Sequence, residues 1–288
     1  MTKIKDSKGL SLLLILFVYL IALAVGLGVY FAIAGNILLR VGIADAVSTI
    51  IVWVAGVIFN NSSVYDAYWS VLPPFVFLLL AFEYGFSTLS LLLIIAVWTW
   101  GVRLTVNWIY TFKNLNFQDW RYDYFKKNNK KLWPLINFFG INFLPTVVVF
   151  FAMVPGIYIV TENLSANYFS YLGFIICLAS VLLQLVSDLQ MHSFREKESD
   201  AVLDTGLWQY SRHPNYLAEI CMWWGIYLML LSAQPSLWWT GIGAVFMTAL
   251  FLLVSIPLME DRQISRRPHY KSYQEKTSKL LLLPKKNN

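Results

Sequence analysis

Residues 10–34 have the sequence LSLLLILFVYLIALAVGLGVYFAIA and contain no charged side chain. A helix of about 20 apolar residues crosses the hydrocarbon core of a bilayer, because each residue adds about 1.5 Å. The apolar core of a signal peptide is shorter, roughly 7–15 residues. We therefore expect this run to be a retained membrane-spanning helix.

Seven further apolar runs follow along the chain, at about 44–59, 70–86, 88–112, 138–160, 168–190, 215–232 and 236–257. Of the 288 residues, 58% are hydrophobic and 13% are charged, whereas about 25% of the residues in a soluble domain are charged. The composition excludes a soluble enzyme, a disordered chain and a disulfide scaffold. It predicts an all-α, polytopic transmembrane bundle of about eight spans, with one membrane domain over residues 1–288.

The distribution of charge predicts how the bundle is oriented. With a cytoplasmic N-terminus, 20 of the 22 Lys and Arg fall in the cytoplasmic segments 1–9, 60–69, 113–133, 191–214 and 258–288. This is the positive-inside pattern, so we expect both termini to be cytoplasmic, in a bacterial inner membrane or the endoplasmic reticulum. The net charge of +6 then reflects topology, and we expect a lipid bilayer rather than nucleic acid as the partner.

Two halves are expected within the membrane domain, an N-terminal half at 10–112 and a C-terminal half at 134–288 that carries the site. Only three histidines occur, His192, His213 and His269, and their wide separation predicts no metal site.

Three of the charged residues inside the predicted spans stand out: Arg103, Asp188 and Glu219. A charge in the bilayer costs at least about 2.5–3.5 kcal/mol, so each is a candidate for function. Arg103 could also pair or snorkel for purely structural reasons. It lies far from the cytoplasmic end of its span, which disfavours snorkelling.

The densest polar stretch is GLWQYSRHPNYLAE, residues 206–219, where a cytoplasmic loop enters the seventh span. Pro214 suits the first turn of a helix. The free amides of that turn, with Arg212 and His213 beside them, predict a site for phosphate. Asn215 can both donate and accept hydrogen bonds. An ordinary interfacial aromatic belt would explain the Trp and Tyr residues of this stretch, but not Asn215 or Glu219.

Two neighbouring segments complete the expected pocket. Asp188, His192 and Arg195 share one side of the sixth span at helical spacing. The segment after the eighth span contains Arg262 and Tyr270, although a basic membrane-surface tail is the plainer interpretation of its lysines. Together these segments predict a cytoplasmic mouth suited to a large anionic cofactor.

The run Ser211–Tyr216, with Glu219 and the WWG of residues 223–225, resembles the signature of the steroid 5α-reductase and sterol C14-reductase superfamily. From about residue 40 to 284 the chain is similar to the DUF1295 branch of that superfamily. The supporting segments are NSSVYDAYWS at 61–70, the segment from Arg103 to Asn107, DWRY at 119–122 and the segment from Tyr270 to Tyr273.

The resemblance implies an oxidoreductase that uses NADPH to reduce a carbon–carbon double bond in a small steroid- or lipid-like substrate. The cofactor would lie at the cytoplasmic mouth, and the substrate would enter from the membrane. The residues implied to bind the cofactor are Arg103, Asp188, Arg195, Arg212, His213, Asn215, Tyr216, Arg262 and Tyr270. Tyr216 and Glu219 are the candidate catalytic pair that handles the proton.

The sequence departs from the pattern of the superfamily at three positions: Ala218 replaces a Gly, Met191 a Lys and Trp100 a Tyr. Two alternatives therefore stay open. One is a membrane methyltransferase that uses S-adenosylmethionine, similar to the isoprenylcysteine carboxyl methyltransferases, which share an Arg-His-Pro-x-Tyr motif. The other is a non-catalytic sterol- or lipid-binding relative.

Overall fold

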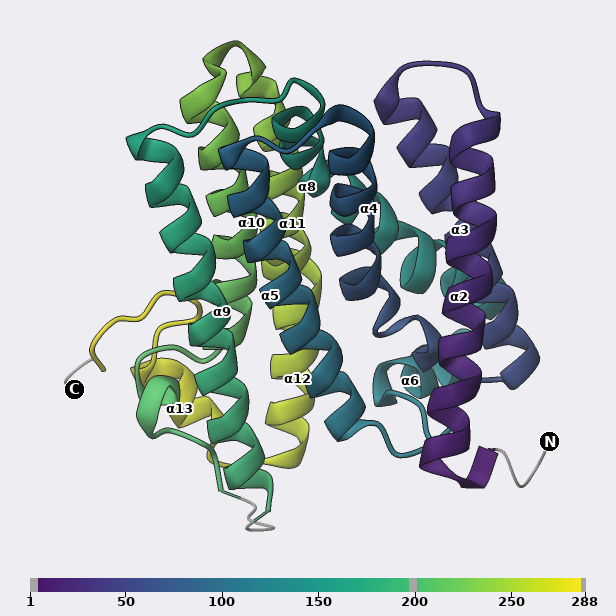
Figure 1. Cartoon of the computed structure of the whole chain (residues 1–288). Helices are drawn as coiled ribbons and strands as arrows, with labels where there is room; N and C mark the ends of the chain where they lie inside the picture. The colour runs from purple at the N-terminus through teal and green to yellow at the C-terminus, as the bar shows by residue number, and fades with distance from the viewer. Residues whose placement is uncertain (1–4, 197–200, 286–288) are drawn as a thin grey trace.

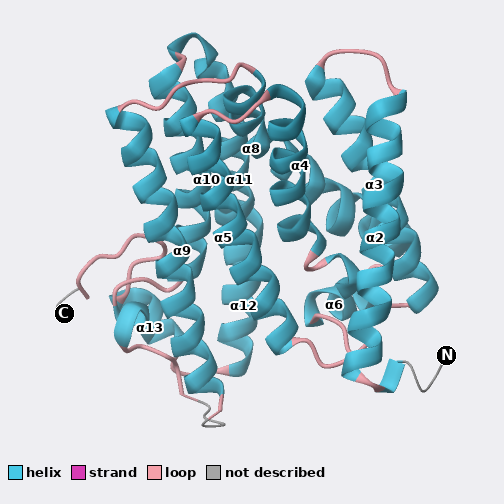
Figure 2. Cartoon of the chain, in the orientation of Figure 1, coloured by secondary structure: helices cyan, strands magenta, loops and turns pink. Residues whose placement is uncertain are grey.

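The computed structural model describes residues 5–196 and 201–285, and this part of the chain is helical and contains no strand (Figure 2). Eight of its helical stretches are long and apolar enough to cross a membrane. The prediction of an all-α bundle with about eight spans is confirmed. Lys3, Lys197 and Lys286, which contribute to the predicted charge asymmetry, lie outside the described residues.

The N-terminal helices form one side of the bundle and the C-terminal helices form the other (Figure 1). The first four spans contain α2 (Lys8–Ala32), α3 (Ile37–Phe59), α4 (Tyr68–Tyr84) and α5 (Thr88–Thr111). The last four contain α8 (Leu144–Thr161), α9 (Tyr168–Arg195), α10 (Pro214–Ala233) and the pair α11 (Ile242–Leu250) and α12 (Ile256–Arg266). The short helices α6 (Trp120–Asn128) and α13 (Tyr270–Lys276) lie at the same end of the bundle, on opposite sides of it (Figure 1).

Several spans start earlier or end later than their hydropathy predicts. The second begins at Ile37 rather than near residue 44, because the Asn36 side chain caps the helix by accepting the N–H of Leu39. Arg40, expected in an outer loop, therefore lies in the first turn of α3 and pairs with Glu83 at 3.2 Å.

Two other spans gain residues at an end. The third span begins at Ser62 because the 3-10 helix η1 (Ser62–Tyr65) precedes α4. The eighth span continues past residue 257 to Arg266.

Two spans contain a π-helical segment, η2 (Ile136–Phe143) before α8 and η5 (Phe251–Ser255) before α12. Each is followed within two residues by a proline, Pro145 or Pro257. Proline lacks the N–H that an α-helix needs and clashes with the carbonyl four residues earlier, which in both spans belongs to the π segment. The wider turns relieve this clash.

The helices that carry the predicted motif are fixed by a close contact. A Cβ added to Gly225 of α10 would lie 2.6 Å from Cys177 Sγ and 2.9 Å from the Gly173 carbonyl oxygen, both on α9. Only glycine permits this approach of two backbones. The pair α9 and α10 is therefore a rigid base for the side chains described next.

Candidate functional site

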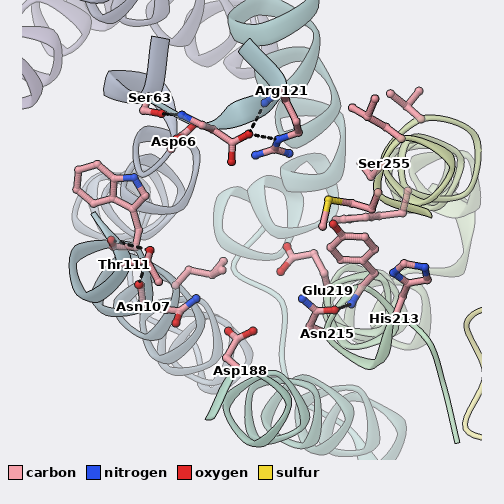
Figure 3. Close-up of a pocket in the computed structure, with 18 of the residues that line it drawn as sticks. Ser63, Asp66, Asn107, Thr111, Arg121, Asp188, His213, Asn215, Glu219 and Ser255 are labelled. Carbon is pink, nitrogen blue, oxygen red and sulfur yellow. Dashed lines mark hydrogen bonds and ion pairs between the residues drawn. The ribbon is translucent and has the colours of Figure 1, made fainter. Parts of the chain in front are cut away.

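A cavity of about 1060 Å³ lies inside the bundle, just above the roughly 300–1,000 Å³ that ligand sites usually occupy. Figure 3 shows polar side chains around it, with Asp66 and Arg121 across the opening from Asp188, and Asn215 and Glu219 on a third side. The wall includes residues of both the predicted N-terminal and C-terminal halves. The site therefore extends beyond the half in which we expected it.

Two polar pairs link α5 to α9 along one wall. Arg103 Nη1 lies 2.6 Å from Asp188 Oδ2, and one turn further His192 Nε2 lies 2.7 Å from Asn107 Oδ1. The spacing of four residues on each helix stacks the two pairs as rungs of a ladder. Arg103 is therefore paired within the bundle rather than snorkelling.

Glu219 forms the third rung, at the α10 side of the ladder. Its carboxylate is 3% exposed and accepts three N–H groups: Trp100 Nε1 at 2.9 Å, Gln184 Nε2 at 2.6 Å and Trp223 Nε1 at 2.8 Å. Charge-assisted bonds of this kind are the strong ones. They hold Glu219 firmly in the cavity wall.

Two atoms of this ladder have no partner. Arg103 Nε and Gln184 Oε1 are buried polar atoms without a hydrogen bond in the described part of the chain, and both residues line the cavity. An unsatisfied buried polar group costs about 1–3 kcal/mol. Because both atoms are buried, neither reaches the surface of the cavity in this structure.

The start of α10 is tied to the C-terminal segment through one buried carboxylate. Glu260 Oε1 lies 2.6 Å from Arg212 Nε and 3.1 Å from His213 Nε2. Arg212 Nη1 also donates to the carbonyl oxygens of Gln274 and Thr277, at 2.7 Å each. Arg212 therefore anchors α12 and α13, and much of its hydrogen-bonding capacity is used within the protein.

Burial lowers the pKa of His213 and outweighs the hydrogen bond to Glu260, which raises it. Its ring stacks on the Tyr216 ring with centroids 5.2 Å apart and planes 6° apart. Asn215 Oδ1 accepts the backbone N–H of Tyr216 at 3.1 Å. His213, Asn215 and Tyr216 thus lie together at the cavity.

Most of the predicted site residues line this one cavity: Arg103, Asp188, Arg195, Arg212, His213, Asn215, Tyr216, Glu219 and Tyr270. Arg262 is the exception, since its guanidinium stacks on the Trp120 ring at 3.9 Å. Their cofactor and catalytic roles stay predictions.

A further wall, formed by η1 and α6, was not predicted as part of the site. The Tyr122 hydroxyl donates to Asp66 Oδ1, and burial and the negative charge of Asp66 both raise the pKa of Tyr122. Arg121 Nε lies 2.7 Å from Asp119 Oδ1, whose backbone N–H donates to Ser63 Oγ at 2.9 Å. Both segments stand out in the sequence, at 61–70 and 119–122, but they were noted only as support for the resemblance and not as part of the site.

The cavity wall as a whole is positively charged. Its lining includes six Lys and Arg residues against four Asp and Glu residues. Arg195 lines it without an ion pair in the described residues. No group of three or more His, Cys, Asp and Glu that could hold a metal ion occurs in the described ranges.

Comparison with known proteins gives one family and one distant relative. The model of the family described as "Protein of unknown function (DUF1295)" matches residues 52–277, which include every predicted site residue. An uncharacterized protein of Schizosaccharomyces pombe is 25% identical over 263 residues, which cover 80% of this chain and 75% of the relative. No solved structure matches the chain.

Proposed function

The chain belongs to the DUF1295 family, and from the geometry of its cavity we propose that it is a membrane-embedded reductase. It would use NADPH to reduce a carbon–carbon double bond of a steroid- or lipid-like substrate. The resemblance of Ser211–Tyr216 to the steroid 5α-reductase-like superfamily supports this proposal.

The observation that carries the proposal is the excess of positive charge around the cavity, whose lining includes six Lys and Arg residues against four Asp and Glu residues and so suits a polyanionic cofactor. Arg195 and Asn215 would hold the phosphates. When bound, the cofactor supplies a hydride.

Side chains of the protein itself would position the cofactor and supply the proton. The ladder between α5 and α9 keeps Arg103 and Gln184 in place, and Glu219 fixes both helices against α10. The Tyr216 hydroxyl makes no hydrogen bond to any described residue, while its ring is held against His213. Tyr216 is therefore our candidate for giving the proton that completes the reduction.

The charge of the wall favours NADPH over the alternative cofactor. NADPH is a polyanion, whereas S-adenosylmethionine carries a cationic sulfonium. An excess of Lys and Arg around the cavity attracts the first and repels the second. The methyltransferase and the non-catalytic lipid-binding protein become the two other outcomes of the test.

The test is thermal unfolding of the purified protein in detergent, with NADPH or S-adenosylmethionine added. At a hundredfold excess over Kd, a ligand stabilises by about 2.7 kcal/mol. For a chain of this size the Tm should rise by about 5 °C. Asn215→Ala should lose the NADPH shift, whereas the matched variant Asn128→Ala, at an exposed position, should keep it.

A shift with S-adenosylmethionine alone would overturn the reductase. An NADPH shift that survives Asn215→Ala would remove the motif from the cofactor site. If NADPH binds, its consumption is then followed at 340 nm with a panel of enone lipids. Binding without consumption would favour the non-catalytic alternative.

A further inference from the structure

The chain after α13 presents an apolar surface that stays exposed in the described part of the chain. Leu281, Leu282 and Leu283 are 56%, 41% and 50% exposed, and the exposed residues Lys279 and Lys285 flank them. In Figure 1 this segment loops outward from the bundle on the side where α9 lies. Three consecutive leucines in water are unfavourable, and such a surface is typical of an interaction site. We call residues 281–283 the leucine hook.

The leucine hook is hydrogen-bonded to the motif that precedes α10. The Leu283 N–H donates to the Tyr210 carbonyl oxygen at 3.2 Å, and the Arg212 N–H donates to the Ser278 carbonyl oxygen at 2.9 Å. These two bonds join the segment after α13 to consecutive parts of the motif loop. The leucine hook is therefore held at a fixed position relative to Arg212.

The residues just before the motif are in turn fixed against α9. Trp208 Nε1 donates to the Ser187 carbonyl oxygen at 3.2 Å, and the Leu207 N–H donates to Gln190 Oε1 at 2.9 Å. Ser187 lies eight residues before Arg195, the last residue of α9, which corresponds to about 12 Å along the helix. The leucine hook therefore lies beside α9 rather than beyond its end.

At this level the outer surface of α9 changes from apolar to polar. Leu185 and Leu189 are exposed, and the next exposed residues toward the end of the helix are Ser193 and Arg195. Because α9 is a candidate membrane span, its exposed leucines face acyl chains, whereas Ser193 and Arg195 face headgroups and water. The leucine hook is thus placed at the boundary between the bilayer and water.

We propose that the leucine hook inserts its side chains into the adjoining leaflet of the membrane and so anchors the motif to the phospholipid surface. Its partner is the upper acyl region of the leaflet, because all three side chains are aliphatic. The Lys279 stem is long enough to bring its ammonium to the phosphates. Lys285 pairs with Asp204 at 3.0 Å, which keeps the following end of the chain at the aqueous side. Pro284 has no N–H to leave unsatisfied at the interface.

Fluorescence quenching tests the depth of the leucine hook. Leu282→Cys carries a nitrobenzoxadiazole fluorophore in a Cys221→Ser background, since Cys177 is buried. Lys276→Cys, at an exposed position of α13, is the matched control. In phosphatidylcholine vesicles, a nitroxide high on the acyl chain should quench position 282 at least about twofold more than position 276, because interfacial apolar side chains insert about 5–10 Å. Aqueous iodide should show the opposite order.

Hydrogen exchange tests the link between the membrane surface and the motif. Leu282→Asp removes an inserted leucine, and Ser272→Asp introduces the same charge at an exposed position of α13. In phosphatidylcholine nanodiscs, the peptide that covers residues 207–213 should exchange at least about tenfold faster in Leu282→Asp, because burial of one leucine favours the inserted state by about that factor. Ser272→Asp should exchange like the wild-type protein.

Equal quenching at positions 282 and 276 would overturn the insertion of the leucine hook. Shielding of position 282 from both quenchers would also overturn it, and would indicate a protein partner instead of lipid. Unchanged exchange at 207–213 in Leu282→Asp would overturn the anchoring of the motif. Neither measurement contains NADPH, so the leucine hook and the proposed reductase are tested independently.

Discussion

Glu219→Gln is the sharpest test of the polar ladder, because it keeps the shape of the side chain and changes only its hydrogen bonding. In the wild-type protein Oε2 accepts from Trp100 and Gln184, and Oε1 accepts from Trp223. A glutamine amide must turn its NH₂ toward one of these positions, where it meets N–H donors. Even the better orientation loses one bond and leaves a buried indole N–H unsatisfied.

The size of the effect follows from these three bonds. The unsatisfied donor costs about 1–3 kcal/mol, and the two remaining bonds weaken because the acceptor is no longer charged. Hydrogen bonds between membrane helices average only about 0.6 kcal/mol, which sets the lower limit. We therefore expect a loss of about 1–4 kcal/mol, or at least about 2 °C in Tm.

The assay is thermal unfolding in detergent, followed by circular dichroism at one scan rate. Glu162→Gln, the same chemical change at an exposed position, is the matched control and should leave the Tm within about 1 °C. If Glu219→Gln and Glu162→Gln unfold at the same Tm, the three donors do not hold the Glu219 carboxylate and the ladder does not stabilise the bundle.

Three further predictions use the same unfolding assay. Asp188→Asn leaves Arg103 buried without a charged partner and should cost about 3 kcal/mol of unfolding free energy. The double variant with Arg103→Leu and Asp188→Leu should be less destabilised, because it leaves no unpaired charge. An unchanged Tm in Asp188→Asn would contradict the pairing. Gly225→Ala should cost about 1–3 kcal/mol, because the added methyl meets a cysteine sulfur 2.6 Å away, whereas Gly28→Ala, which meets nothing, should cost nothing. Burial lowers the pKa of His213 below 6.5 in the folded protein, so as the pH falls the unfolded protein binds a proton at His213 before the folded protein does. His213 therefore lowers the stability of the fold below pH 6.5 and leaves it unaffected above that pH. The wild-type Tm should then fall more between about pH 7 and pH 5 than that of His213→Gln, and parallel curves would refute this.

Hydropathy and short-range spacing predicted the features that depend on one helix. Eight apolar runs became eight spans, and Pro214 begins α10 as its position before a polar turn indicates. Asp188 and His192 lie on the same wall because they are one turn apart. Such features follow from the periodicity of a single helix, which the sequence contains in full.

The features that depend on which helices are neighbours could not be predicted in the same way. Trp100 was noted only as a departure from a family pattern, yet its indole N–H bonds Glu219, more than a hundred positions later. The wall formed by Asp66 and Tyr122 combines the start of the third span with α6, which lies between two spans. Their contact depends on where α6 packs, and no periodicity within either segment encodes it.

The two unsatisfied atoms limit what the ladder can be for. A network that served only to hold α5 against α9 would gain stability from satisfying every buried donor and acceptor, since each unsatisfied one costs about 1–3 kcal/mol. The ladder satisfies most of its polar atoms but leaves Arg103 Nε and Gln184 Oε1 without partners, both in residues that line the cavity. Unsatisfied groups in otherwise paired networks are typical of sites that give up stability for function. Because both atoms are buried, a bound molecule or a water recovers that cost only if the side chains of the ladder move to meet it.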